Sequence, residues 1–320
     1  MQRLVLAAIA IAALALASLF VGVGEVTPAR LWTEGFGGEA GELLLVSRVP
    51  RTLAILLAGT GMAVAGLIMQ LLAQNRFVEP STAGTVESAS AGLLVMMLLA
   101  PGAPVIAKML AAAAFALAGT LLFLAILARV PLRSPLVVPL VGIMLGGVVN
   151  AATTFFAYRF DLMQSLQAWT MGDFSGVLRG RYELLWLAFA LTVVAYLAAD
   201  RLTLAGLGRD LSIGLGLDHG RTVFLGLVIV SLVTAVVVAT VGIILFVGLI
   251  VPNIVALFLG DNARRSVPWV ALIGAGFVLL CDMAGRLIAA PYELPVGTVV
   301  GVAGAALFLG LLLARRDRLG

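Results

Sequence analysis

Residues 52–73 read TLAILLAGTGMAVAGLIMQLLA and contain no charged side chain. A helix needs about 20 consecutive apolar residues to cross the hydrocarbon layer of a bilayer, and this stretch is long enough. Other stretches of the chain share its character, and the short connections between them hold nearly all of the charge. The candidate spans are 4–23, 52–73, 84–100, 105–128, 135–157, 184–200, 222–241, 243–259, 268–288 and 296–314.

The overall composition leads to the same conclusion, because 62% of the residues are hydrophobic and only 11% are charged. Backbone polar groups within a bilayer must be satisfied inside the protein, so helices are expected. We predict an all-α polytopic membrane protein of about ten transmembrane helices, forming a single transmembrane domain over residues 1–320. The stretch 4–23 is followed by no convincing cleavage site, and we interpret it as a retained first helix.

The positive charge of the chain, +4 at pH 7, is explained by membrane topology rather than by nucleic-acid binding. Ten spans place both termini on one side of the membrane. If that side is cytoplasmic, twelve of the 20 Lys and Arg residues lie inside and eight lie outside. Cytoplasmic connections are enriched in Lys and Arg, so both termini are predicted to be cytoplasmic.

Catalytic, cofactor and metal sites are not expected. The single cysteine, Cys281, lies in an apolar run, and the single histidine, His219, offers no cluster of ligands. No Gly-rich loop is followed by Lys-Ser or Lys-Thr, so an ATP site would have to belong to a partner chain. We therefore predict a transport subunit that is not an enzyme.

Ionisable residues inside spans are costly and usually have a partner or a function. Asp282 and Arg286 lie four residues apart and can pair on one helix face, as an internal salt bridge or with a functional role for Arg286. Glu87 is expected near a membrane boundary. A proton relay would need several acids at depth and none is identified, which argues against the alternative of an ion-driven secondary transporter without excluding it.

The connection from about 201 to 221 is long for a compact bundle. Within it we predict a short helix over about 209–217, bracketed by Gly208 and by glycines at 216–220, which would project as a rigid knob. The alternative is a simple solvated connector. On the other side, the segment 158–183 has an amphipathic pattern typical of a helix lying along the membrane surface.

Several segments resemble one family, the FecCD permease subunits of type II ABC importers for iron-siderophore, haem and cobalamin. The segment 48–51 reads RVPR and resembles the family's R-x-P-R, and 242–252 reads GIILFVGLIVP and matches G-x-I-x-F-V-G-L-x-x-P. Asp282 and Arg286, followed by ELPVG at 293–297, match A-D-x-x-x-R … E-L-P-x-G. The segment 74–80, QNRFVEP, stands where members usually have N-P-L-A-x-P.

The resemblance implies a ten-helix subunit that pairs with a second permease chain, as a homodimer or a paralogous heterodimer. Two ABC ATPase subunits would bind below, and a periplasmic or lipid-anchored substrate-binding protein would dock above. It implies that Arg48, Arg51 and Arg286 pair with acidic residues of the binding protein. It places the ATPase-coupling role on Leu207, Gly208, Arg209, Asp210, Leu215 and Gly216.

Departures from the common motif point to one branch of the family. Arg76, Phe77 and Val78 replace the usual Pro-Leu-Ala, and the run 75–85 resembles permeases for siderophores of the petrobactin and anguibactin kind. The resemblance therefore implies import of a ferric siderophore across the bacterial cytoplasmic (inner) membrane. Haem and cobalamin remain the alternatives within the family.

Overall fold

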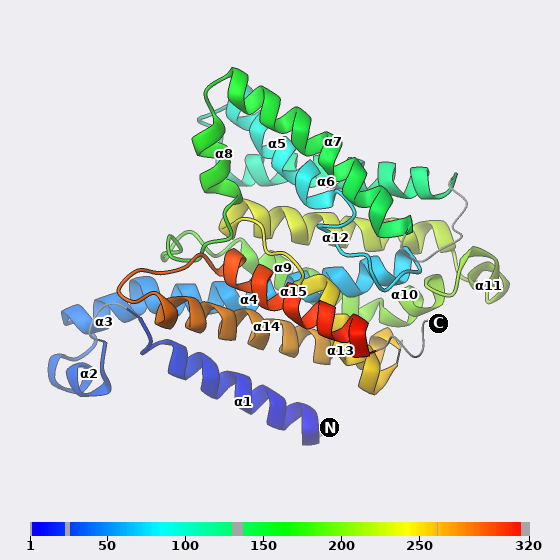
Figure 1. The fold of residues 1–320 in the computed structure, drawn as a ribbon. Coiled ribbons are helices and arrows are strands. Elements are labelled where there is room, and N and C mark those ends of the chain that lie inside the picture. Colours follow the sequence, from blue (N-terminus) through cyan, green and yellow to red (C-terminus); the bar gives the residue numbers. More distant parts are fainter. Residues whose placement is uncertain (1, 23–25, 130–136, 261, 315–320) are drawn as a thin grey trace.

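The computed structural model describes residues 2–22, 26–129, 137–260 and 262–314 (Figure 1). Regular structure in these ranges is helical, with no strand. The long helices are α1 (Gln2–Ser18), α4 (Val49–Leu72), α5 (Thr85–Leu99), α6 (Val105–Leu127), α7 (Val137–Arg159), α9 (Leu185–Leu197), α12 (His219–Val241), α13 (Val247–Leu259), α14 (Ala263–Ile288) and α15 (Val296–Ala314). The short elements are α2 (Pro28–Glu34), α3 (Glu39–Leu43), the π-helical turn η1 (Leu44–Arg48), α8 (Met163–Thr170), α10 (Ala199–Ala205) and α11 (Arg209–Gly214).

Each of the ten predicted spans coincides with one of the long helices, apart from residues 23, 135 and 136, which lie outside the described ranges. In the described part of the chain, five helices are long and apolar enough to cross a membrane alone. The helices α9 and α10 are long and apolar enough together but are bent by 68° relative to each other, and α1, α5, α13 and α15 are shorter apolar helices. The all-α polytopic prediction is confirmed.

Boundary differences of a few residues occur at the end of α1 and the starts of α13 and α14, and α13 begins at Val247 instead of near residue 243. Gly242 and Phe246 both have positive φ angles, 86° and 63°, and this left-handed backbone cannot continue a helix. The chain between them is therefore an irregular connection that joins α12 to α13.

The centre of the bundle is α4, which packs most extensively against α14, α12 and α13 (Figure 1). Its small residues allow close approach: a Cβ built on Gly59 would lie 2.7 Å from the backbone oxygen of Gly274 in α14. In the most apolar 18-residue window of the stretch 39–72, which includes α4, 83% of the residues are buried. In the corresponding window of α7, 22% of the residues are buried. The core therefore follows α4, and α7 is peripheral.

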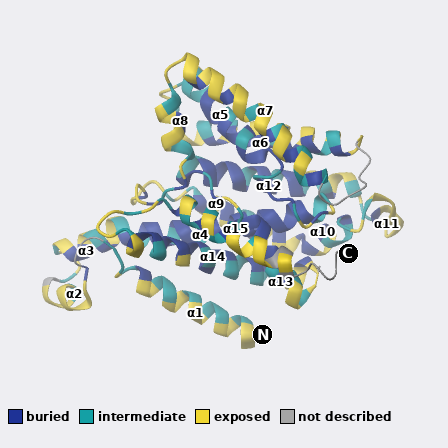
Figure 2. Cartoon of the chain, in the orientation of Figure 1, coloured by how far each residue is buried: buried dark blue, intermediate teal, exposed yellow. Residues whose placement is uncertain are grey.

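The outer helices expose apolar side chains along much of their length (Figure 2). On α7 these include Leu140, Met144, Val148 and Phe155, all more than half exposed. Such a surface is stable only against lipid or another protein. The exposed apolar exterior fits a protein that crosses a bilayer.

The two ends of the bundle differ in character (Figure 1). The first, called here the α2 end, carries α2, α3 and the segment 171–184, where the Arg179 amide donates to the Val46 carbonyl at 3.0 Å. The opposite one, the α11 end, carries α10 and α11. Helix α1 begins and α15 ends at the α11 end, so the two described chain ends lie on the same side.

Candidate functional site

Two of the arginines singled out in the sequence meet one carboxylate at the α2 end, where α4 begins and α14 ends. Arg51 donates from Nε and Nη2 to Oδ1 of Asp282, at 3.1 and 2.7 Å, and from Nη1 to Oε2 of Glu293 at 2.5 Å. Arg286 donates from Nη2 to Oδ2 of Asp282, which is fully buried. The internal salt bridge between Asp282 and Arg286 is confirmed, and Arg51 shares it from 231 residues away.

The same cluster also holds the end of α1. Arg286 Nη1 donates to the carbonyls of Ser18 and Val21, at 3.0 and 2.7 Å, and its Nη2 donates to Ser18 Oγ at 2.6 Å. Arg48 Nη1 donates to the Val21 carbonyl at 2.5 Å. Carbonyls at a helix C-terminus lack intrahelical partners, and guanidinium donors satisfy them here.

These contacts leave little of the three guanidinium groups accessible. Arg48, Arg51 and Arg286 are 6%, 6% and 2% exposed. The resemblance implied that they face outward toward a binding protein, whereas in this structure each has partners inside the chain. Besides Arg30 in α2, the exposed arginines at this end include Arg179 and Arg181, in the segment 171–184.

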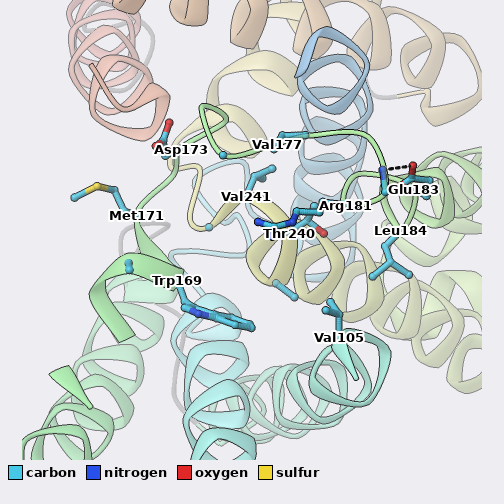
Figure 3. A pocket seen from close by; sticks show the side chains of 15 residues that line it. Val105, Trp169, Met171, Asp173, Val177, Arg181, Glu183, Leu184, Thr240 and Val241 are labelled. Atoms are coloured by element: carbon cyan, nitrogen blue, oxygen red, sulfur yellow. Dashed lines mark hydrogen bonds between the residues drawn. The ribbon is translucent and has the colours of Figure 1, made fainter. Parts of the chain in front are cut away.

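A cavity of about 610 Å³ opens beside these exposed arginines (Figure 3). It lies between α8, the end of α12 and the segment 171–184, with Trp169, Met171, Asp173 and Arg181 among its lining. Lys108 Nζ lies 5.1 Å from the centroid of the Trp169 ring, a cation–π distance. Helix α8 is the helical part of the predicted amphipathic segment.

The projecting helix predicted at the other end is present as α11. It is preceded by Gly208 and followed by Gly216, whose φ angles of 102° and 80° favour glycine. Its inner face is fixed by Ser212, which is buried and whose Oγ lies 2.8 Å from His219 Nδ1. Its outer surface is apolar: Leu207, Leu211, Ile213 and Leu215 are each more than half exposed. Arg209 and Asp210 are exposed beside them.

The preceding helix, α10, is attached to the first turn of α14. Arg264 Nη1 donates to Asp200 Oδ2 at 2.6 Å, and the Ala263 amide donates to Thr203 Oγ1 at 3.0 Å. The α11 knob is therefore joined through α10 to the long central helix α14.

A feature not predicted from the sequence is the attachment of the connection 73–84 to the start of α13. Glu79 is 1% exposed, and its Oε1 accepts from the Phe246 amide at 3.0 Å and from Ser81 Oγ at 2.5 Å. Asn253, in α13, donates from Nδ2 to the Arg76 carbonyl at 2.7 Å. A carboxylate at a helix N-terminus is stabilised by the unpaired amides there. The motif at 74–80 identified this connection, but not its position against α13.

Glu79 should make this attachment depend on pH. Burial raises the pKa of its carboxyl from 4.5 to about 7, although hydrogen bonds from Ser81 and from the amides of Phe246, Leu249 and Gly248 act to lower it. Because the folded state has the higher pKa, it holds the proton more tightly, so stability falls as pH rises from about 4.5 to about 7. The shift corresponds to about 3 kcal/mol.

The measurement is thermal unfolding of the purified protein in detergent at pH 5.5 and pH 7.5. We expect a higher Tm at pH 5.5, and a much smaller difference in Glu79→Gln, which has no carboxyl to titrate. Glu183→Gln, which changes an exposed carboxylate, should keep the full difference. An unchanged pH dependence in Glu79→Gln would show that other groups cause it.

Within the described ranges, no group of three or more His, Cys, Asp or Glu side chains is placed to hold a metal ion. Together, the apolar exterior, the central α4 and the two distinct ends define a polytopic α-helical membrane protein with surfaces for partners. The sequence matches the FecCD transport family over residues 9–315, and the chain belongs to this family of transport permeases. The predicted family is confirmed.

Comparison with individual proteins shows which members of the family the chain is similar to. The chain is 46% identical over 303 residues to the petrobactin import system permease protein YclN of Bacillus subtilis (strain 168), covering 95% of each. It is 40% identical over 296 residues to the ferric-anguibactin transport system permease protein FatD of Vibrio anguillarum (strain ATCC 68554 / 775), covering 92% of this chain and 94% of that one. The predicted resemblance to the petrobactin and anguibactin branch is confirmed.

The fold has a counterpart among solved structures, an inward-facing ABC transporter described as of the metal-chelate type. The TM-score is 0.80, with 98% of this chain and 99% of that chain covered. Sequence identity is only 23%, so the likeness concerns the fold. It confirms the predicted importer permease fold.

Proposed function

We propose that this chain is the permease subunit of an ATP-driven importer that passes a ferric siderophore across the bacterial cytoplasmic (inner) membrane. Two relatives that align along nearly the whole chain, at 46% and 40% identity, carry petrobactin and ferric anguibactin in their names. The chain would receive its cargo from a substrate-binding protein and pass it inward while separate subunits hydrolyse ATP. The chain itself carries out no reaction.

The observation that supports ATP coupling most directly is the exposed apolar surface of α11. Leu211, Ile213 and Leu215 are 62%, 54% and 62% exposed on a helix that its flanking glycines separate from the bundle. Apolar side chains grouped on a projecting element are typical of a protein interface. We assign this surface to the ATPase, with Gly208 and Gly216 setting its angle and Arg209 and Asp210 at its rim. The α11 end, and with it both termini, would then be cytoplasmic.

The test is co-purification and transport with an ATPase and a binding protein of the siderophore type. The importer reconstituted in proteoliposomes should hydrolyse ATP faster when the binding protein carries a ferric siderophore. A double variant, Leu211→Asp with Leu215→Asp, should lose the ATPase on purification while remaining folded. Interface positions of this kind each contribute about 2 kcal/mol or more, which is roughly a 30-fold loss of affinity per position.

The matched control is Trp32→Asp, because Trp32 is 92% exposed on the short helix α2 at the opposite end. This variant should keep the ATPase. Normal ATPase binding and coupling in the α11 double variant would contradict the assignment. An intact complex with no stimulation by any ferric siderophore-loaded binding protein would instead redirect the search to haem and cobalamin.

The α2 end would face the binding protein. Docking of the binding protein through Arg48, Arg51 and Arg286 stays a prediction. To dock, these side chains would have to give up their present partners within the chain and bind acidic residues of the binding protein instead. Arg179 and Arg181 need no such exchange, because they are exposed at the same end. Arg forms forked, charge-assisted hydrogen bonds with carboxylates, which suits either set to an acidic partner.

A second permease chain completes the proposed complex, as a homodimer or a paralogous heterodimer. The peripheral helices α7 and α15 leave room for it, because both expose apolar side chains such as Val148 and Val302. The cargo would pass where the two permease chains meet.

A further inference from the structure

A second cavity lies along the inner side of α7 and has a polar lining unusual for its surroundings. It has a volume of about 480 Å³ and lies between α5, α7 and α8. We call it the α5–α7 cavity. Its polar lining residues include Glu87 and Ser90 from α5, Asn150 and Thr153 from α7, and Gln167 and Thr170 from α8.

The cavity lies at depth rather than at a membrane boundary. A Cβ built on Gly146 would lie 3.2 Å from Cδ of Glu87, so the carboxyl rests against α7 at that point. Gly146 is roughly 14 Å along the axis from Val137 and roughly 20 Å from Arg159, at 1.5 Å per residue. Glu87 was expected near a boundary, and it lies instead beside the middle of a helix long enough to span.

Nothing in the described chain neutralises this carboxylate. Its Oε2 is buried and has no hydrogen-bond partner there, and no Lys, Arg or His is found among the described residues that line the cavity. Buried polar atoms are nearly always paired, and an ionisable side chain at this depth usually marks the path of a substrate or ion. The unpaired oxygen beside a cavity therefore marks a position where a hydrogen-bond donor of a ligand would bind.

Three of the hydroxyl groups around the cavity are already committed as donors. Ser90 Oγ donates to the Val86 carbonyl at 3.0 Å, Thr153 Oγ1 to that of Val149 at 2.8 Å, and Thr170 Oγ1 to that of Leu166 at 2.9 Å. What these oxygens still offer is lone pairs, and an ionised carboxylate can only accept. Beside the amide groups of Asn150 and Gln167, which can both donate and accept, the cavity therefore offers Glu87 and these hydroxyl oxygens as acceptors and suits a positively charged donor.

We propose that Glu87 is a specificity-determining residue that receives a protonated amine of the cargo as it passes the α5–α7 cavity. The assignment rests on the proposed function and identifies the cargo class as metal chelates that carry a cationic amine. A lone inorganic cation shares this chemistry. The amine is favoured because the cavity is much larger than one ion and borders the open position of Gly147, where an added Cβ would meet nothing within 4 Å.

The experiment compares two cargoes in proteoliposomes that contain the complete importer with its ATPase and binding protein. One is a ferric catecholate siderophore with a free secondary amine, and the other is the same compound with that amine acylated. Glu87→Gln keeps the shape and removes the charge. It should slow uptake of the amine cargo about tenfold or more, the scale of losing a charge-assisted hydrogen bond. The acylated cargo should change less than twofold.

Thr192→Ala is the control, because it removes a buried hydroxyl on α9, outside the cavity, and no charge, and it should transport both cargoes nearly as well as the unmodified protein. Equal uptake of the amine cargo by Glu87→Gln and by the unmodified protein would overturn the assignment. A sodium requirement that disappears in Glu87→Gln would overturn it in favour of an inorganic cation. Failure of the unmodified protein to take up either cargo would count against the proposed function itself.

Discussion

Asp282→Ala is expected to leave the protein unable to fold stably. Asp282 is 0% exposed and is bonded to both Arg51 and Arg286, so its removal leaves two buried guanidinium groups without their shared carboxylate. Breaking a buried ion pair by removing one partner costs about 3–5 kcal/mol, which is a large part of the stability of most domains. The measurement is the yield and Tm of monodisperse protein in detergent.

Glu293→Gln is the matched control, because Glu293 contacts the same Arg51 with a side chain that is 23% exposed. Water can replace part of that interaction, so a much smaller loss is expected. Exchanging Asp282 together with the two arginines it pairs, as Arg51→Met, Asp282→Leu and Arg286→Met, should recover part of the stability, because the two guanidinium groups are removed with their shared carboxylate. A Tm for Asp282→Ala close to that of the unmodified protein would refute this account of the cluster.

Gly66→Ala is expected to have the second large effect, by separating α4 from α13. The new Cβ would lie 2.1 Å from the Gly248 carbonyl oxygen and 2.2 Å from the Gly248 Cα. Both atoms belong to the backbone, so no side-chain rotation can relieve the clash. Gln70, one turn farther along α4, would also lose the alignment of its hydrogen bonds to the carbonyls of Gly248 and Leu249.

Overpacking of this kind costs about 1–3 kcal/mol, and a backbone clash belongs at the upper end. Gly301→Ala provides the comparison, because a Cβ on that helical glycine of α15 would meet nothing within 4 Å. It should be neutral or slightly stabilising, since Ala favours helix by about 0.5–1 kcal/mol over Gly. Equal melting temperatures for the two variants would show that α4 and α13 can separate without loss. Thermal unfolding in detergent measures both variants.

The helices could be predicted from the sequence because a span is recorded locally, as a run of apolar residues of sufficient length. The knob at α11 was predicted for a similar reason, since Gly208 and Gly216 mark its ends within a few residues of each other. The Asp282–Arg286 pair is also local, at one helical turn. Features of this kind can be predicted without knowing which segments pack against them.

The parts that could not be predicted depend on contacts between distant segments. The family resemblance implied that Arg51 pairs with a partner protein, and nothing in the sequence indicated its contacts with Asp282 and Glu293, which lie far along the chain. The depth of Glu87 depends on the connection 73–84 lying against α7 and α13, which hydropathy does not record. Glu87 was therefore expected near a membrane boundary, whereas it lies beside the middle of α7.

Helix α14 connects the α11 end of the bundle to the α2 end, the two ends proposed above to bind partner proteins. It is one continuous helix of 26 residues, about 39 Å long at 1.5 Å per residue. Its first turn is tied to α10 by Arg264 and Asp200, and its last turns hold the arginine cluster. A tilt of about 5° imposed at one end would displace the other by about 3 Å over that length. Motion imposed at α11 would therefore be transmitted along α14 to the α2 end, with Pro268 near the start of the helix as a place where it can bend.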